Sequence, residues 1–260
     1  MRKYNMEETK KILQTIATAK LQKKEARTLG LMLEKALLNE KLTLAEESNL
    51  NRFLKTNGLF EKLQFIYEIY ETNLERDFAE TIIRHELLPP DVYPMYKRFK
   101  GLINNEIKLA RIDKKEKVLF IGSGPFPLSA ILLNKLAGCV VDCYETKKKH
   151  ADISRMVISH LRLEDRIRII RRKGEYLNND NYSVIIVALL AKPKKEIIER
   201  ISGKLPGNIK VICRTSHGIR RAFYEPTDLR TLGSLQIIAT KRATGNQTIS
   251  SLFMQKSSNL

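Results

Sequence analysis

The first part of the chain carries apolar residues at a spacing of three and four, which is typical of amphipathic helices. Gly58 separates two of these segments, and Pro89-Pro90 ends the third, because proline cannot extend a helix. A further helical pattern follows at 92–112. We therefore predict an all-helical cap domain over residues 1–112. Its first three helical segments cover residues 8–38, 43–56 and 59–87.

From about residue 116 the pattern changes to short apolar runs that alternate with helical segments. This alternation is typical of a mostly parallel sheet covered by helices on both faces. Two strands close together at the end predict an antiparallel hairpin at one edge. We therefore predict an α/β fold over residues 113–260, with a Rossmann-like doubly wound sheet. The expected strands are 117–122, 139–145, 166–170, 182–190, 209–215, 234–242 and 248–256, and the expected helices are 127–137, 150–162 and 194–205.

The first predicted strand runs into a glycine turn, Gly122-Ser123-Gly124-Pro125, which a helix follows. In open α/β sheets a ligand binds at the carboxyl ends of the strands, next to this turn. The glycines let the backbone approach the ligand, and the helix start offers free N–H groups. Pro125 and Pro127 fit a helix start, where a missing N–H does no harm. These four turn residues are our predicted ligand-binding turn.

An acidic residue, Glu145, ends the second predicted strand, 21 residues after Gly124. A carboxylate at this point accepts hydrogen bonds from ribose hydroxyls, so the ligand is a nucleoside, either a dinucleotide or S-adenosylmethionine. The pyrophosphate fingerprint G-x-G-x-x-G is not met, because Pro127 stands at its third glycine, and this favours S-adenosylmethionine. The alternative is a tight structural turn with a surface glutamate and no ligand.

The net charge of +18 is concentrated after residue 110. Residues 1–110 hold 19 Lys and Arg against 16 Asp and Glu, whereas the remainder holds 28 against 13. A basic half is typical of proteins with an anionic partner such as RNA. The basic runs fall in separate loops without interleaved aromatics, so we favour a solvated lysine-rich surface and do not expect nucleic acid as a partner.

The apolar runs and the cysteines indicate in which cell compartment the protein is expected. No run approaches the ~20 apolar residues of a membrane span, and the start of the chain lacks the apolar core of a secretory signal. Cys139, Cys143 and Cys213 lack metal-ligand spacing. We therefore expect reduced thiols in a cytoplasmic protein, with no membrane partner and no metal in the enzyme.

Four stretches resemble the nicotianamine synthase family, including its archaeal and bacterial relatives that make opine-type or thermonicotianamine metallophores. FIGSGPFPLSAILL resembles the family's glycine turn with its two characteristic prolines. VALLAKPKKEII is similar to the segment at the end of the fourth strand. RTSHGIRRAFYEP is similar to a highly distinctive segment of the family, with Arg214, His217, Gly218, Arg220, Tyr224 and Pro226 in place. GNQTISSLFMQK is similar to the closing strand. The resemblance covers residues 60 to 256.

The resemblance implies an aminocarboxypropyltransferase with S-adenosylmethionine as co-substrate. An amine attacks the γ-carbon of the methionine portion, and methylthioadenosine leaves. The product is a metal-chelating small molecule, as in nicotianamine biosynthesis. The small amino-acid acceptor stays open between glutamate, histidine, another amino acid and S-adenosylmethionine itself, and so do the number of transfers and a homodimer.

An alkyl-ammonium cannot attack, so the reaction needs a proton acceptor near the amine. The resemblance implies that Glu75, on the helix YEIYETNLERDFAET, is this base. Its rivals on the same helix are Glu71, Asp77 and Glu80. A solvated surface glutamate is the structural alternative.

The family also has a tyrosine seven residues before a glutamate, in the helix ahead of the glycine turn. That glutamate matches Glu106, and the tyrosine position is Phe99. We expect Tyr96, one turn earlier on the same face, to take the role, with Tyr93 as a further candidate. Core packing with a satisfied hydroxyl is the alternative for these tyrosines.

The segment RTSHGIRRAFYEP holds the residues that we expect to bind the substrate. Arg214 and Arg220 suit a carboxylate, which an arginine binds through two parallel hydrogen bonds. His217 and Tyr224 complete this expected substrate-binding set. Ion pairs between the arginines and local acids are the alternative.

The sequence says less about the residues that bind the adenine end of the predicted ligand. Gly174 and Glu175 follow the third strand, where many such domains place an acid for the adenine amino group. Leu189, at the end of the fourth strand, is expected in the wall that faces the reacting centre.

Two other functions remain open from the sequence. An S-adenosylmethionine-dependent RNA methyltransferase would explain the basic α/β half, but the methyl-transfer run Asn/Asp-Pro-Pro-aromatic does not follow the fourth strand. A binding module that keeps the fold without turnover is the third possibility, and Phe99 in place of the family's tyrosine leaves room for it.

Overall fold

The chain forms two compact units in a computed structural model that describes residues 4–20, 23–38, 42–84, 88–177, 181–204 and 208–256. The helical unit is Met1–Leu74 with Thr215–Pro226 and Arg242–Ser250. The sheet unit is Glu75–Arg214 with Thr227–Lys241 and Ser251–Leu260. Residues 75–112 thus group with the sheet, and the expected domain boundary at residue 112 stays a prediction.

Helices form the framework of the helical unit. α1 begins with a capping box, in which the Asn5 side chain accepts from the Glu8 N–H and Glu8 binds back to the Asn5 N–H. α3 begins in the same way at Thr43 and Glu46. These side chains satisfy N–H groups that have no partner inside the helix, which fixes where each helix starts. The described helices of this unit are α1 (Met6–Thr18), α2 (Lys23–Leu38), α3 (Leu44–Thr56), the first part of α4 (Phe60–Arg84) and the 3-10 helix η3 (Gly218–Ala222).

The predicted helical segment 8–38 forms two helices, because the backbone of Ala19 after α1 is extended. The positions at which the chain joins α2, residues 21–22, lie outside the described residues. The predicted end of the segment 59–87 also lies outside the described residues, because residues 85–87 are not described.

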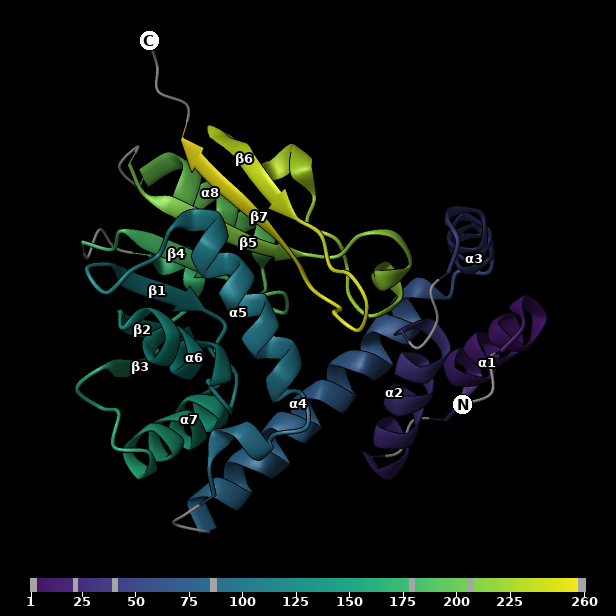
Figure 1. Cartoon of the computed structure of the whole chain (residues 1–260), viewed down its shortest axis with the longest axis horizontal. Coiled ribbons are helices and arrows are strands. Elements are labelled where there is room, and N and C mark those ends of the chain that lie inside the picture. Colours follow the sequence, from purple (N-terminus) through teal and green to yellow (C-terminus); the bar gives the residue numbers. More distant parts are fainter. Residues whose placement is uncertain are drawn as a thin grey trace. The chain divides into compact units, whose positions relative to one another are not determined.

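In the described residues of the sheet unit, seven strands form one sheet in the order β3-β2-β1-β4-β5-β7-β6 (Figure 1). β3, β2, β1, β4 and β5 pair in parallel, whereas β6 and β7 pair antiparallel at one edge. This confirms the predicted α/β fold, a Rossmann-like doubly wound sheet, and its edge hairpin. The strands are β1 (Lys117–Ile121), β2 (Val140–Glu145), β3 (Ile167–Arg171), β4 (Val184–Val187), β5 (Lys210–Thr215), β6 (Leu235–Lys241) and β7 (Ser250–Lys256).

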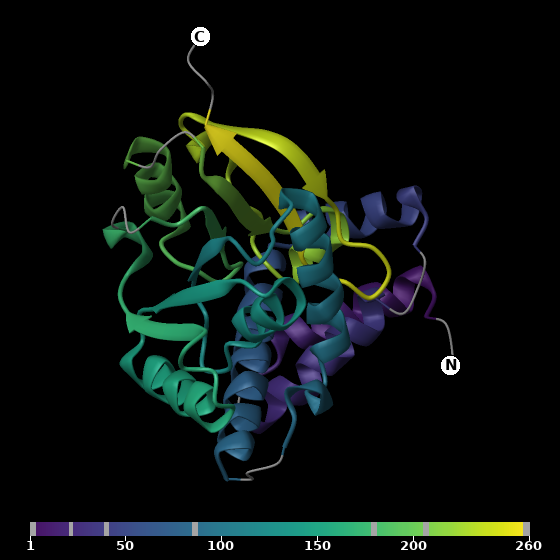
Figure 2. The same cartoon turned by 60° about the vertical axis from the view of Figure 1, so that its left-hand side comes forward.

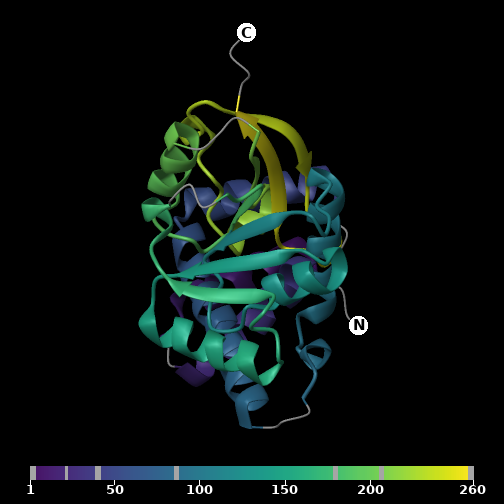
Figure 3. The same ribbon diagram turned by 90° about the vertical axis from the view of Figure 1, so that its left-hand side faces the viewer.

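The strand order reverses between β1 and β4, and this reversal defines where a ligand can bind. The chain moves from β1 to β2 in one direction and from β4 to β5 in the other, so right-handed crossovers put their helices on opposite faces. Figure 3 shows the strands from the side of β3. The crevice at such a reversal opens at the carboxyl ends of the strands. The other described helices of this unit are α5 (Tyr96–Ala110), α6 (Leu128–Ala137), α7 (Lys148–His160), α8 (Lys194–Lys204), η1 (Pro90–Val92), η2 (Gly174–Tyr176) and η4 (Leu229–Thr231).

Burial keeps the three thiols protonated at neutral pH. Cys139, Cys143 and Cys213 are buried and free. Burial raises the pKa of the Cys139 thiol to about 11 and also raises the pKa values of Cys143 and Cys213.

Among the residues that the structure describes, no cluster of His, Cys, Asp or Glu is arranged to hold a metal ion. Within the same ranges, no helix is long and apolar enough to cross a membrane.

Two glycines give a matched test of the packing around the sheet. A Cβ on Gly174 would lie 2.6 Å from Ile121 Cγ2 and 2.9 Å from Ile197 Cγ1, so we expect Gly174→Ala to destabilise the fold by about 1–3 kcal/mol. A Cβ on Gly203, in α8, would meet nothing within 4 Å, and we expect Gly203→Ala to stabilise by about 0.5 kcal/mol. Urea unfolding of both variants checks this, and equal midpoints would contradict it.

Candidate functional site

The glycine turn lies between β1 and α6, where the sequence predicts it. Gly122 has φ +88° and Gly124 has φ +69°, a left-handed conformation that favours glycine. A Cβ on Gly122 would lie 3.1 Å from the Ala191 Cβ, so the end of β1 passes close to the segment after β4. The Gly122 N–H donates to the Tyr144 carbonyl at 2.8 Å, which ties the turn to β2. The turn is therefore fixed by both of its neighbouring strands.

Glu145, the expected ribose acid, is buried at the end of β2 and holds the turn in place. Its carboxylate accepts from the Gly124 N–H at 3.0 Å and from the Lys147 N–H at 2.8 Å. A carboxylate accepts about four hydrogen bonds, so it retains capacity for ligand hydroxyls. Burial lowers the pKa of the nearby His150, although the charge of Glu145 opposes this shift.

Glu75 brings a second carboxylate to the same turn. A Cβ on Gly124 would lie 2.7 Å from Glu75 Oε2, so this oxygen occupies the space beside the glycine. Glu75 is half-buried on α4, in the part of the helix that belongs to the sheet unit. The structure therefore brings together Glu75, Gly124 and Glu145, which the sequence analysis assigned to one site.

An aromatic trio next to the turn was missed by the sequence analysis. Phe78, Tyr93 and Phe126 pack in edge or tilted geometry, with ring centroids 5.0–5.1 Å apart. Such contacts are worth about 0.5–1.5 kcal/mol each beyond area burial. Phe126 lies in the turn, and Phe78 lies one helical turn after Glu75. The trio thus fixes α4 against the turn, and no sequence pattern reveals it because its three members lie far apart along the chain.

Tyr96 and Phe99 are both buried on α5. The Tyr96 N–H donates to the Tyr93 carbonyl at 2.9 Å, which starts the helix. The Tyr93 ring contacts Phe126 of the turn, as described above. The catalytic role of Tyr96 stays a prediction, and the ring of the other candidate, Tyr93, contacts the turn at Phe126.

At the expected adenine end, Glu175 offers an acceptor without a partner. Its Oε2 is buried and has no hydrogen-bond partner among the described residues, while Oε1 lies 3.8 Å from Lys173 Nζ. Buried polar atoms are almost always paired, so this oxygen is suited to a ligand N–H. Gly174 beside it packs against Ile121 and Ile197.

Leu189 is buried just beyond β4, as expected for a wall residue. Its carbonyl accepts from Lys194 Nζ at 2.8 Å, and the same ammonium donates to the Arg214 carbonyl at 3.2 Å. Lys194 therefore holds the carboxyl ends of β4 and β5 at one point. The contact between Leu189 and a ligand stays a prediction.

Arg214 has a protein carboxylate as its partner. Its Nε and Nη2 donate to the two oxygens of Glu106, each at 2.9 Å, and Nη1 donates to Ser129 Oγ at 3.0 Å. Both charged side chains are buried. The guanidinium thus makes with Glu106 the two parallel bonds that we expected it to offer a substrate, and its substrate-binding role stays a prediction.

The other three expected substrate-binding residues lie in the helical unit. Arg220 donates to the carbonyls of Gln247 at 2.6 Å and Gly245 at 2.8 Å, and burial lowers its pKa. The Tyr224 hydroxyl lies 2.9 Å from both oxygens of Glu71, a rival of Glu75. His217 Nδ1 is buried with no hydrogen-bond partner among the described residues. Burial, with a smaller effect of Arg242, lowers the pKa of His217 and favours its neutral form.

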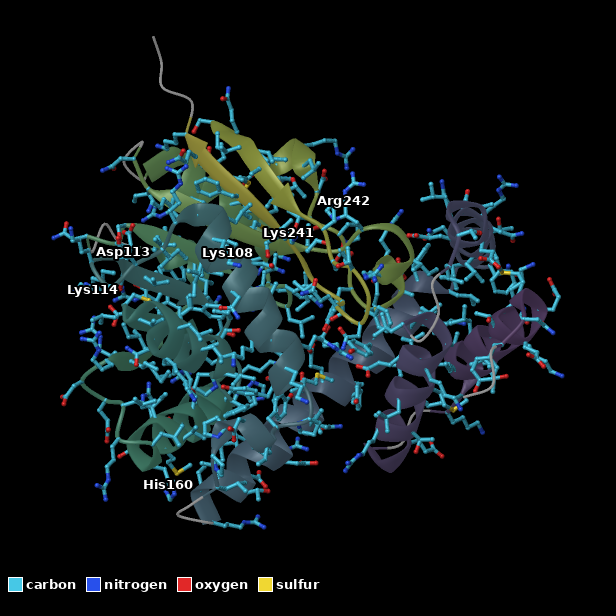
Figure 4. All side chains as sticks on the ribbon, in the orientation of Figure 1. Lys108, Asp113, Lys114, His160, Lys241 and Arg242 are labelled. Carbon is cyan, nitrogen blue, oxygen red and sulfur yellow. The ribbon has the colours of Figure 1, made fainter. Side chains whose placement is uncertain are left out.

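Polar residues at the opposite ends of the strands do not belong to this site. Figure 4 shows Lys108 near the end of α5, and Asp113 and Lys114 in the turn before β1. His160 ends α7, which returns the chain toward the start of β3. These residues lie at the amino ends of the strands, whereas the glycine turn lies at the carboxyl ends.

A doubly wound sheet with a glycine turn after β1 and an acid at the end of β2 is typical of nucleoside-binding α/β proteins. The family model described as "Nicotianamine synthase protein" matches residues 13–260. The chain therefore belongs to the nicotianamine synthase family, which confirms the expected relationship.

Two curated relatives carry the name L-histidine 2-aminobutanoyltransferase. The one from Yersinia pestis is 30% identical over 128 residues, which cover 49% of this chain and 48% of the relative. The one from Pseudomonas aeruginosa (strain UCBPP-PA14) is 26% identical over 140 residues, which cover 54% and 53%. The chain spans about half the length of the curated relatives it matches.

Solved structures of MtNAS share the fold. A glutamate-to-glutamine mutant in complex with S-adenosylmethionine gives a TM-score of 0.87 at 22% identity, covering 98% of this chain and 99% of that chain. MtNAS in complex with MTA and tNA gives a TM-score of 0.83 at the same identity and coverage. The similarity extends over both units and supports the fold described above.

The glycine turn can be tested with a matched control. Gly124→Ala adds a methyl group beside Glu75 Oε2, so we expect affinity for adenosine and S-adenosylmethionine to fall at least about 10-fold by calorimetry. Gly58 has φ +60° but nothing within 4 Å of an added Cβ, so Gly58→Ala carries similar backbone strain of about 1–2 kcal/mol without touching the turn. Equal loss of affinity in both variants would rule out a ligand at Gly124.

Proposed function

We propose that the chain transfers a 3-amino-3-carboxypropyl group from S-adenosylmethionine to an amine, releases methylthioadenosine and so builds a metal-chelating small molecule. The observation that carries the proposal is the Glu75 carboxylate beside Gly124 in the turn after β1. Membership of the nicotianamine synthase family and the names of the curated relatives support the same reaction.

The proposed step needs a neutral amine and a correctly aimed carbon. The amine lone pair forms a bond to the γ-carbon of the methionine portion, and the carbon–sulfur bond breaks with its electrons going to sulfur. The sulfonium becomes neutral methylthioadenosine, and the proton of the amine passes to Glu75. Because the sulfonium already activates the carbon, we expect no metal ion to be needed in the enzyme. Tyr96 keeps its proposed role beside the base.

The adenosine part would lie along the carboxyl ends of β1, β2 and β3. Glu145 accepts from the Gly124 N–H and has remaining acceptor capacity for the ribose hydroxyls, and Ser123 is a proposed binding residue of the same turn. The unpaired Oε2 of Glu175 would accept from the adenine amino group. The other proposed binding residues are Gly122, Pro125, Gly174 and Leu189.

Among the acceptors that the sequence left open, L-histidine is the first to test, since both curated relatives are named for it. Of the proposed substrate-binding residues, Arg214, Arg220 and Tyr224 already have protein partners. His217, with its unpaired Nδ1, is the residue best suited to a direct contact. The reduced, buried thiols favour a cytoplasmic location.

Product analysis tests the reaction directly. We expect incubation with S-adenosylmethionine and L-histidine, glutamate or other amino acids to give methylthioadenosine and an aminocarboxypropyl adduct, detected by mass spectrometry. S-adenosylhomocysteine with methylated RNA would instead indicate the RNA methyltransferase. Binding without consumption would indicate a module without turnover.

The base can be tested with two substitutions on α4. We expect Glu75→Gln to reduce adduct formation at least about 10²-fold, because an amide cannot accept the proton, while binding of S-adenosylmethionine persists. Glu80 lies on the same helix and pairs with Arg84 at 3.6 Å, so Glu80→Gln is the control and should keep its rate. Near-normal turnover by Glu75→Gln would show that another group is the base.

A further inference from the structure

The chain leaves the sheet unit in two loops, 215–226 and 242–250, and returns each time. Arg214 and Thr227 flank the first loop, and Lys241 and Ser251 flank the second. The first loop carries His217, and Arg220 of this loop donates to carbonyls of the second loop. The two loops are therefore linked to each other, and their stems lie in the sheet unit.

One buried carboxylate binds both stems. Glu106 of α5 accepts two hydrogen bonds from Arg214 at 2.9 Å, and its Oε1 also accepts from Ser251 Oγ at 2.8 Å. The exposed fractions are 0% for Glu106, 3% for Arg214 and 1% for Ser251. Figure 2 shows α5 next to the start of β7, which carries Ser251. We name Glu106, Arg214 and Ser251 the stem clamp.

Each stem is also closed on itself. The Thr227 hydroxyl donates to the Arg214 carbonyl at 3.2 Å, so the residues on the two sides of the first loop bind each other. Lys241 pairs with Ser251 in the β6–β7 ladder, which closes the second loop. Glu106 therefore binds one residue from each of two closed stems.

A buried ion pair is a poor choice if stability is the only purpose. Removing two charges from water is costly, and apolar residues of similar volume often stabilise as well or better. The pair does fix geometry, because a bidentate arginine–carboxylate contact sets both the distance between the two side chains and their relative orientation. The serine hydroxyl on the same oxygen extends that geometry to the second stem.

We propose that Glu106 is a positioning residue, which fixes the starting points of both loops through the stem clamp. The consequence for catalysis rests on the proposed function, because His217 and its neighbours in these loops are the proposed substrate-binding residues. Glu106 itself contacts no substrate in this proposal and acts through Arg214 and Ser251.

Hydrogen exchange of the free protein tests the clamp without any substrate. In Glu106→Gln we expect amides in 215–226 and 242–250 to exchange at least about 10-fold faster, whereas β1 and β4 change by less than about twofold. The control is Glu116→Gln, which removes an ion pair of 2.5 Å with Lys210 at the other end of β5. Unchanged loops in folded Glu106→Gln, or equal acceleration in the control, would overturn the proposal.

Two further variants separate positioning from stability. Ser251→Ala removes one hydrogen bond and should accelerate exchange in 242–250 more than in 215–226, even if Glu106→Gln does not fold. The double variant Glu106→Gln with Arg214→Gln buries neither charge of this pair. Its melting temperature should therefore return toward the wild-type value, while the amides of both loops still exchange fast. If the double variant recovers both its melting temperature and the slow exchange of the loops, the proposal is wrong and the Glu106–Arg214 pair only stabilises the fold.

A kinetic measurement depends on the proposed reaction, whereas the hydrogen-exchange experiment does not. We expect Ser251→Ala to lower kcat with the amine acceptor at least about threefold, while KM for S-adenosylmethionine changes by less than about twofold. If the wild-type protein forms no adduct, the proposed function fails while the exchange experiment still decides on the clamp. If Ser251→Ala raises KM for S-adenosylmethionine instead, the positioning role is wrong.

Discussion

The left-handed backbone at Gly122 and Gly124 is the constraint on which the site depends. Any side chain at Gly124 would occupy the place of Glu75 Oε2, and any side chain at Gly122 would press on Ala191. Two glycines therefore allow a helix-borne carboxylate and the segment after β4 to approach the same turn. The Gly124 N–H points to Glu145, so the turn also orients the acid at the end of β2.

Carboxylates lie at the glycine turn although the chain as a whole is basic. The protein carries a net charge of +18, yet Glu75 and Glu145 both lie at the turn, and Glu175 follows β3. A cationic sulfonium is favoured by nearby carboxylates, and a partly buried site is screened less by salt than the surface is. Net charge alone is therefore a poor guide to the ligand of this turn.

Sequence patterns predicted the parts of the fold that depend on neighbouring residues. Alternating apolar runs located the strands, and the Gly-Pro turn located the ligand-binding end of β1, because both reflect local backbone preferences. The Phe78–Tyr93–Phe126 trio and the Glu106–Arg214 pair could not be predicted, since their members lie far apart in sequence, 108 residues in the case of the pair. The sequence does not reveal the buried partner of Arg214, whose substrate-binding role stays a prediction. For the same reason, the contact of Gln64 with the Arg221 carbonyl, which helps group a late loop with the helical unit, left no signal.

Local and long-range constraints therefore contribute differently to the proposed chemistry. The glycine turn, Glu145 and Glu175 are set by short segments next to strand ends, and in the proposed function these segments bind the nucleoside. The acceptor has no such local motif, and the residues proposed for it lie in loops whose stems meet at Glu106. This difference explains why the spacing of short segments indicated a nucleoside, whereas no sequence pattern indicated the acceptor.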